Sequence, residues 1–362
     1  VYPITLSYKV LGNPVIGYTV LIFLLLIAVF GLSRIEFNYG PTKYLPDSNA
    51  VRSDFVKAGE KFGRMNVPLM VAVEDVQDPA LWIELNVLAN RLESLPLGQI
   101  RVSWFYKQMA SLSKALSLDV DGGFLPFPSS EAEFSQLLLL FDPIDLEMYF
   151  DQEQEFVLMM LQIPFEGSKD YFILKGVVDE FFRNSSLDGH LVGRVGSFFE
   201  TGHRLGSDTF RGLAIGGIVI FVVLWILFRS FLMALVGISV NALPVLAGVG
   251  VMGILKIDID MGSSIVAAVA FGIILDDSTH LLARVKRLVK AGYDPSTSVA
   301  RTIRELASPI FATTVAISVG FSVLLLAEMQ PFNDFAIVIL VTLVMALISD
   351  LLLLPLLVRK FF

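Results

Sequence analysis

The sequence predicts an α-helical polytopic membrane protein with six spans and one α+β domain outside the bilayer. Hydrophobic residues make up 55% of its 362 residues, and the mean hydropathy is +0.70. Six apolar stretches approach the ~20 residues that a helix needs to cross a bilayer. One long segment after the first stretch instead has the charge density of an ordinary soluble domain. These observations exclude a soluble enzyme.

The candidate spans are arranged as one plus five, with the soluble segment after the first. We expect them at Pro14–Ser33, Leu213–Phe228, Leu232–Leu255, Met261–Leu282, Ala307–Ala327 and Phe335–Leu357. The first apolar run is too long for a secretory signal and lacks its small-residue cleavage site, so we expect a retained anchor. The chain begins with Val1 rather than Met, which suggests that further residues precede it.

The spans divide the chain into residues 1–33 with the first span, a domain at 34–208, and a five-span membrane domain at 209–362. Basic residues of short loops stay cytoplasmic, and with six spans the Lys and Arg residues concerned fall on one side. They are Lys9, Arg229, Arg284, Lys286, Arg287, Lys290, Arg301, Arg304, Arg359 and Lys360. This pattern predicts cytoplasmic termini, a cytoplasmic basic loop at 283–306 and an extracytoplasmic large domain.

The charge of the chain is divided in the same way. Residues 34–208 carry 15 Lys/Arg and 26 Asp/Glu, net −11, whereas the remainder carries 12 and 9, net +3. An acidic domain argues against nucleic acid as its partner. The sequence contains no cysteine, which excludes disulfides and thiol chemistry.

Two β-α-β units are predicted within the large domain. Their elements are a strand at Val67–Glu74, a helix at Asp78–Leu95, a strand at Gln99–Tyr106, a strand at Glu155–Ile163, a helix at Lys169–Arg183 and a strand at His190–Val195. Packed together as a split β-α-β sandwich, they would form a porter-like domain. Between them, the loop at 122–128 has the sequence Gly-Gly-Phe-Leu-Pro-Phe-Pro. It is either a lid or lipid-contacting element, or it packs beneath the domain.

Two adjacent carboxylates, Asp276 and Asp277, interrupt the apolar run at 262–280. An ionisable residue at membrane depth costs at least ~2.5–3.5 kcal/mol, which makes this pair a candidate for handling protons or ions. Two neighbouring carboxyls in a low dielectric do not both ionise easily, so we expect one to bind a proton reversibly. His280 and Arg284 lie on the face of Asp276 at helical spacing. His280 is a candidate shuttle or an interfacial residue, and the alternative for the pair is a cluster that only fixes helix packing.

Three further residues complete the predicted proton relay of Asp276, Asp277 and His280. Thr313 and Thr314 of the fifth span are candidate hydrogen-bond partners of the carboxylate pair, although membrane threonines equally bond their own helix. Asp350 of the sixth span is either a packing or interfacial carboxylate or a member of the relay. Asn241 and Pro244 are expected to mark a kink in the third span.

Four stretches carry recognisable motifs. They are a Leu-Pro-Asp-Ser linker within 37–50, a Phe-Arg-Ser-Phe turn at 228–231, the segment Gly-Ile-Ile-Leu-Asp-Asp-Ser-Thr-His at 272–280, and the span sequences at 307–321 and 349–355. With the one-plus-five order of spans, they resemble one repeat of the resistance-nodulation-division (RND) superfamily. The local match is to its MMPL-like exporters of hydrophobic or lipid cargo, whose Gly-x-x-x-Asp-[Asp/Tyr]-x-x-His pattern is similar to residues 272–280.

The resemblance implies a transporter in the bacterial cytoplasmic (inner) membrane that is driven by the proton gradient through acidic residues of the fourth span. Its cargo would be a lipid or another hydrophobic molecule, received by a periplasmic acceptor protein. Members of this superfamily usually have two repeats, so this chain is either half of a longer polypeptide or associates with a second copy. The alternatives are a non-pumping lipid-binding or sterol-sensing membrane module and a protein-translocation accessory.

Enzyme chemistry has little support in the sequence. The three histidines have no metal-ligand spacing, and there is no phosphate-binding Gly-Lys-Ser/Thr loop. We therefore expect a secondary active transporter without cofactor or metal. Gly212, Gly216, Gly217 and the later glycine pairs are expected to be helix-packing positions.

Overall fold

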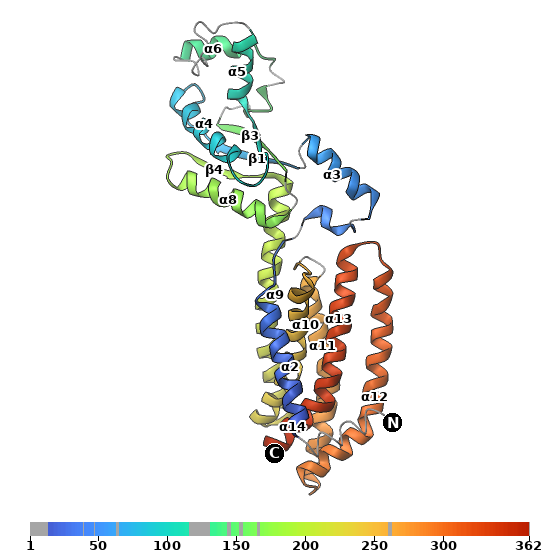
Figure 1. The fold of residues 1–362 in the computed structure, drawn as a ribbon. Helices are drawn as coiled ribbons and strands as arrows, with labels where there is room; N and C mark the ends of the chain where they lie inside the picture. The colour runs from blue at the N-terminus through green and yellow to red at the C-terminus, as the bar shows by residue number, and fades with distance from the viewer. Residues whose placement is uncertain are drawn as a thin grey trace. The chain divides into compact units, whose positions relative to one another are not determined.

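The computed structural model describes residues 14–38, 40–46, 48–62, 65–115, 131–142, 146–151, 155–164, 167–259 and 263–361 (Figure 1). The chain forms two compact units. The membrane unit comprises Val1–Tyr39, Tyr44–Pro46 and Gly202–Phe362, and the α/β unit comprises Gly40–Lys43 and Asp47–Thr201. The helix α9 (Gly193–Phe228) contributes residues to both units.

The α/β unit contains one antiparallel sheet with the strand order β2-β3-β1-β4. Its elements are β1 (Met65–Ala72), α4 (Pro79–Glu93), β2 (Arg101–Ser103), β3 (Phe156–Ile163), α8 (Ser168–Arg183) and β4 (Asp188–Leu191). Because β3 lies between β1 and β2, and β1 lies between β3 and β4, each β-α-β unit is split by a strand of the other. The predicted split β-α-β arrangement is thus confirmed.

The strands follow from alternation in the sequence. Every second residue of β1 from Val67 to Val71 is fully buried, as is every second residue of β3 from Val157 to Ile163. Side chains of a strand alternate between its faces, so one face of the sheet forms the core. The helices α4 and α8 lie side by side, joined by an ion pair of 3.0 Å between Arg91 and Glu180.

Two predicted strands extend well past the C-terminal ends of those observed. The strand expected to reach Tyr106 ends at Ser103, and helix α5 (Phe105–Ala115) begins there. Trp104 and Phe105 are both fully buried, with ring centroids 5.9 and 5.6 Å from that of Trp82. A strand would send these neighbours to opposite faces, whereas the turn into α5 buries both.

The predicted end of the strand at His190–Val195 was also wrong. The strand β4 ends at Leu191, and α9 begins at Gly193. Gly193 has a φ of 88°, a left-handed conformation that glycine adopts without steric cost and that ends the extended chain. The remaining elements of the unit are η1 (Pro41–Tyr44), α3 (Ala50–Phe62) and α6 (Glu131–Leu138). The predicted loop at 122–128 lies outside the described residues.

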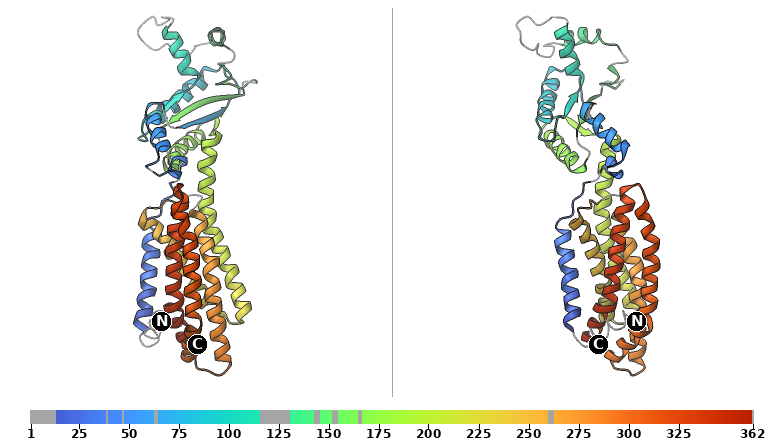
Figure 2. Two further views of the ribbon diagram at one scale, coloured as in Figure 1. Left: turned by 90° about the vertical axis from the view of Figure 1, so that its right-hand side faces the viewer. Right: turned by 45° about the vertical axis from the view of Figure 1, so that its right-hand side comes forward.

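The described part of the membrane unit contains six helices long and apolar enough to cross a bilayer, which confirms the six predicted spans (Figure 2). They are α2 (Pro14–Leu32), α9, α10 (Phe231–Leu255), α11 (Ser263–Lys290), α12 (Pro295–Ser322, extended by η2, Val323–Leu326) and α13 (Gln330–Ile348). The last continues through a π-helical turn, η3 (Ser349–Leu353), into α14 (Leu354–Phe361).

Glycines bring α2 and α10 into close contact. A Cβ atom added to Gly31 would lie 1.9 Å from the carbonyl oxygen of Gly250, and one added to Gly253 would lie 2.0 Å from that of Gly31. Small residues allow this approach of helix backbones within a membrane. By contrast, Cβ atoms added to Gly212, Gly216 or Gly217 of α9 would have no atom within 4 Å. The packing role predicted for glycine is thus confirmed in α10 and wrong for these three positions.

Candidate functional site

A carboxyl group lies in the interior of the helix bundle. Asp350 is only 2% exposed, and it occupies the π-helical turn η3 between α13 and α14. The hydroxyl of its neighbour Ser349 donates to the carbonyl oxygen of Val240 in α10, at 2.9 Å. Single π-helical turns within α-helices are rare and are frequently found at functional sites. The turn therefore fixes where this carboxyl group points.

Three helices contribute to a buried polar network of Asn241, Ser278 and Asp350. The hydroxyl of Ser278 in α11 is bonded to Oδ1 of Asp350 and lies 3.2 Å from Oδ1 of Asn241 in α10. The amide nitrogen of Asn241 donates to the carbonyl oxygen of Gly237 at 2.7 Å. Because Asn241 and Ser278 are also almost completely buried, the network is a polar centre inside apolar packing.

The number of hydrogen-bond donors and acceptors in the network favours a protonated Asp350. A serine hydroxyl has a single hydrogen to donate, so Ser278 serves either Asn241 or Asp350. If Asp350 carries a proton, it can donate to Ser278 while Ser278 donates to Asn241, and both contacts of the serine hydroxyl are then hydrogen bonds. Among the described residues, Ser278 is the one hydrogen-bond partner of Asp350, and no Lys, Arg or His pairs with it. An ionised carboxylate would therefore lack compensation.

Asp276 and His280 of the predicted relay lie on a different face of α11 from Ser278. Their side chains form a pair with 3.3 Å between Oδ1 and Nε2, and they are 77% and 71% exposed in the single chain. Asp277 lies between the two faces and is half-buried. The line of charges continues to Arg284, which forms an ion pair of 2.7 Å with Glu305 of α12.

Thr313 and Thr314 bond their own helix. Their hydroxyls donate to the carbonyl oxygen of Ile310 at 2.9 and 2.8 Å. This is the second of the two arrangements expected for membrane threonines, and a role for them in a relay stays a prediction. The structure thus separates the predicted relay residues into a buried centre at Asp350 and an exposed line on α11, with the threonines bonded locally on α12.

Two residues of the buried network are not evident from the sequence. Asn241 is expected there only to mark a kink, and Ser278 is absent from the predicted relay. The spacing of residues in α11 nevertheless indicates that Ser278 is buried. Buried positions recur every three or four residues, at Phe271, Ile274, Ser278 and Leu281. That period places Ser278 on the core face of the helix and Asp276 outside it.

A metal site is not part of this arrangement. Within the described ranges, no group of three or more His, Cys, Asp and Glu residues could hold a metal ion. Asp350 is the titratable group of the buried network, and its carboxyl group can bind and release a proton.

Six spans around a buried carboxyl group, with a split β-α-β unit after the first span, define an RND-type membrane protein. The sequence model of the MMPL family matches residues 174–360, and the chain belongs to this family. The resemblance seen in the sequence motifs is thereby confirmed, and family membership indicates an RND-type transporter of a generally non-enzymatic class.

A relative from an archaeon is also similar to this chain. The membrane protein MJ1562 of Methanocaldococcus jannaschii is 29% identical over 148 residues, which cover 37% of this chain and 37% of the relative. The chain thus matches little more than a third of that protein's length. Because the relative is archaeal, location in a bacterial inner membrane stays a prediction.

Proposed function

We propose that this chain is one repeat of a proton-driven RND-type transporter that exports lipids or other hydrophobic molecules from the cytoplasmic membrane. Membership of the MMPL family supports the transporter class. The observation that carries proton coupling is the buried bond between Asp350 and Ser278. A carboxyl group inside a membrane bundle, bonded to groups that suit its neutral form, is a candidate proton carrier.

Protonation of Asp350 would select between two packings of the bundle. In the neutral form, the chain of hydrogen bonds from Asp350 through Ser278 to Asn241 joins α10, α11 and η3. In the ionised form, Ser278 turns to Asp350, Asn241 loses its donor, and a buried charge remains with one partner. That state favours a packing that brings water to the carboxylate. Each proton that crosses 100 mV supplies ~2.3 kcal/mol to such a cycle.

The exposed line on α11 would connect this centre with the cytoplasmic side. In this proposal, Asp276 and His280 exchange protons with the side of the membrane that holds the basic loop at 283–306. Asp277 then passes the protons toward the buried network, because it is the neighbour of Ser278 in the chain. Thr313 and Thr314 would assist by exchanging their bonds to α12 for bonds to the carboxylates when the helices move.

The exposed pair of Asp276 and His280 also supports a partner in the membrane. Asp276 lies within the apolar part of a spanning helix, where a charged group facing lipid costs at least ~2.5–3.5 kcal/mol, and its partner His280 lies one turn closer to Arg284. We therefore assign this face to a second RND repeat or a second copy of the chain. The large domain would be extracytoplasmic and would pass cargo to an acceptor protein.

The experiment begins with native mass spectrometry of the gently solubilised protein, which identifies copy number and bound lipid. That lipid is then reconstituted with the protein in vesicles, and its transfer to acceptor vesicles is measured with and without a pH gradient. We expect transfer to require the gradient, and we expect Asp350→Asn and the double variant Asp276→Asn, Asp277→Asn to abolish it without loss of folded protein.

Gradient-independent lipid binding that survives all of these substitutions would overturn the proposal. It would favour a non-pumping lipid-binding or sensing module. Crosslinking of the protein to unfolded secretory chains, with no lipid transfer, would favour a translocation accessory.

A further inference from the structure

Positive charges gather around the turn between α9 and α10, where the chain leaves one candidate span and enters the next. Arg229 lies in the turn itself, and Lys286 and Lys290 lie one helical turn apart near the end of α11. The ammonium group of Lys286 donates to the carbonyl oxygen of Phe228, and the charges of Lys290 and Arg229 both act on it. We call Arg229, Lys286 and Lys290 the cation cluster.

The cation cluster has no carboxylate partner. Within the part of the chain that the structure describes, none of its three residues forms an ion pair. The carboxylates of the helical hairpin made by α11 and α12 are engaged elsewhere, because Glu305 is paired with Arg284 and Asp294 caps α12. Like charges close to one another repel, so an anion that binds between them relieves this repulsion.

One member of the cluster is held in place by α9. The carbonyl of Phe228 lies in the last turn of that helix, where carbonyl groups lack a partner within the helix. It accepts a hydrogen bond from Lys286, whose ammonium nitrogen lies 5.7 Å from the centre of the Phe228 ring. An ammonium group has three N–H donors, so two remain for a ligand. Lys286 is therefore a positioned charge.

The surroundings of the cluster indicate which kind of anion binds. Trp225, Ile226 and Leu227 before the turn and Phe231 after it are exposed, and the rings of Trp225 and Phe231 are in edge contact at 6.3 Å. Tryptophan is enriched where the acyl region of a bilayer meets the headgroups. An anion at the turn thus has cations and an exposed apolar surface beside it, which suits a phosphate group joined to acyl chains. A free phosphate ion would gain nothing from the apolar surface.

We propose that the cation cluster binds the phosphate of an anionic phospholipid, such as phosphatidylglycerol, from the membrane surface at this end of the bundle. The N-terminus of α10 follows the turn directly, and its partial positive charge also favours an anion. The bound phosphate would join the turn between α9 and α10 to α11. The proposal depends neither on the transport cycle nor on the identity of the cargo, because the headgroup is recognised by its charge.

The test compares two lipids that differ only in their headgroups. Dioleoyl phosphatidylglycerol is anionic, whereas dioleoyl phosphatidylcholine has the same acyl chains and no net charge. Native mass spectrometry of the full chain in a mild detergent measures the dissociation constant of each lipid. Because each basic residue near an anionic headgroup strengthens binding about fivefold, we expect phosphatidylglycerol to bind at least about tenfold more tightly.

Two residues at opposite ends of α10 provide a variant and its matched control. Among the described residues other than glycine, Arg229 and Lys256 are those with a positive φ, of 44° and 57°. Glycine adopts this conformation without steric cost, and this gain offsets the added freedom of the unfolded chain. Arg229→Gly and Lys256→Gly should therefore both unfold within a few degrees of the unaltered protein. Only Arg229→Gly should weaken the binding of phosphatidylglycerol, about fivefold.

A second pair of variants tests whether the binding is local. Lys290→Gln removes a charge of the cluster, and Arg304→Gln removes an exposed charge from α12, outside the cluster. Both variants change the net charge equally. Lys290→Gln should weaken the binding of phosphatidylglycerol about fivefold, and Arg304→Gln should leave it unchanged. The affinity for phosphatidylcholine should be the same in all four variants.

Equal affinities of the unaltered protein for the two lipids would overturn the proposal. Equal weakening by Arg229→Gly and Lys256→Gly, or by Lys290→Gln and Arg304→Gln, would do so as well, because it would indicate a general effect of net charge. Glycerol 3-phosphate carries a phosphate without acyl chains, and we expect that a large excess of it does not displace phosphatidylglycerol. Displacement would refute the lipid as the ligand and assign the cluster to a soluble phosphate compound.

Discussion

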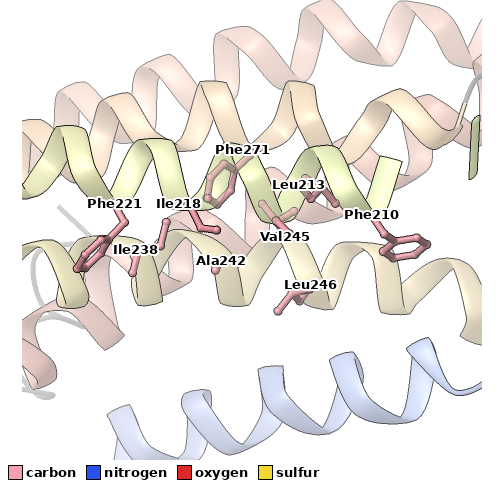
Figure 3. A pocket seen from close by; sticks show the side chains of 11 residues that line it. Phe210, Leu213, Ile218, Phe221, Ile238, Ala242, Val245, Leu246 and Phe271 are labelled. Carbon is pink, nitrogen blue, oxygen red and sulfur yellow. The ribbon is translucent and has the colours of Figure 1, made fainter. Parts of the chain in front are cut away.

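The helices α9 and α10 are both apolar and rich in glycine, yet they are packed in opposite ways. In the apolar stretch of α10, 61% of residues are buried, compared with 6% in α9. A Cβ at Gly250 or Gly253 of α10 would meet the backbone of the segment that contains α2, whereas a Cβ at Gly212, Gly216 or Gly217 of α9 would meet open space. The difference shows that the role of a membrane glycine is decided by what lies opposite it. Gly250 faces Gly31 of α2, whereas Gly217 lines an apolar cavity between α9, α10 and α11 (Figure 3).

The largest effect is expected where backbones meet. A Cβ at Gly250 would lie 2.5 Å from the carbonyl oxygen of Ile27 and 3.1 Å from the Cα of Ala28. Overpacking typically costs ~1–3 kcal/mol and more where the obstacle cannot turn aside, so Gly250→Ala should destabilise the protein by about 3 kcal/mol or more. Thermal unfolding of the solubilised protein, followed by the loss of its size-exclusion peak, measures this change.

The matched control is Gly216→Ala in α9. No atom obstructs the added methyl group, and alanine is favoured over glycine within a helix by ~0.5–1 kcal/mol. This variant should therefore unfold at a slightly higher temperature than the unaltered protein. If both substitutions destabilised the protein equally, the contrast between α9 and α10 would be broken.

Much of the fold follows from local patterns in the sequence. The length of the apolar stretches predicts the six spans. The alternation of residues that are buried with residues that are not predicts the strands β1 and β3, because a strand with one buried face has apolar residues at every second position. The end of β2 could not be predicted in this way. It depends on Trp104 and Phe105 meeting Trp82, and this contact forms only in the folded chain.

The candidate site was less accessible to the same reasoning. Asp276 is conspicuous in sequence because its charge interrupts an apolar run, but Asp350 acquires its partners from α10 and α11. Ser278 lies 72 positions before Asp350 and 37 after Asn241. Helical spacing can indicate that Ser278 faces the core, but the identity of its partners requires the packing of three helices. The low burial of α9 likewise cannot be predicted from its composition.

An intermediate effect is expected inside the closely packed region. Ser278→Ala removes the bond to Asp350 and the donor for Asn241, and a buried polar group without a partner costs ~1–3 kcal/mol. Ser239→Ala is the control, because this exposed hydroxyl bonds only the carbonyl of Leu235 in its own helix. The control should change stability by no more than ~0.5 kcal/mol.

A double-mutant cycle sharpens this result. Asp350→Asn and Ser278→Ala act on one bond, so their effects on unfolding should not add, with a coupling of about 0.5–3 kcal/mol. Additive effects would mean that the buried network does not act as a unit. The close packing of α10 would then rest on its glycines alone.

The smallest effect is expected at α12, which resembles α9 because only 11% of its apolar stretch is buried. A helix with little packing depends more on its cap. Asp294 caps α12 by accepting a hydrogen bond of 2.9 Å from the backbone N–H of Thr297. Hydrogen bonds from the side-chain hydroxyl of Thr297 and from its backbone N–H hold the pKa of the Asp294 carboxyl below its ordinary value of 3.8.

A lowered pKa gives this cap a defined pH dependence. Its contribution is complete above the ordinary value of 3.8 and is lost as the pH falls through the lowered pKa of the folded state. Asp294→Asn keeps a capping oxygen but cannot titrate. The difference in unfolding temperature between the unaltered protein and Asp294→Asn should therefore be constant above pH 3.8. In more acidic buffer, the unaltered protein should lose stability relative to Asp294→Asn. A difference independent of pH would mean that α12, despite its exposure, is held by packing as α10 is.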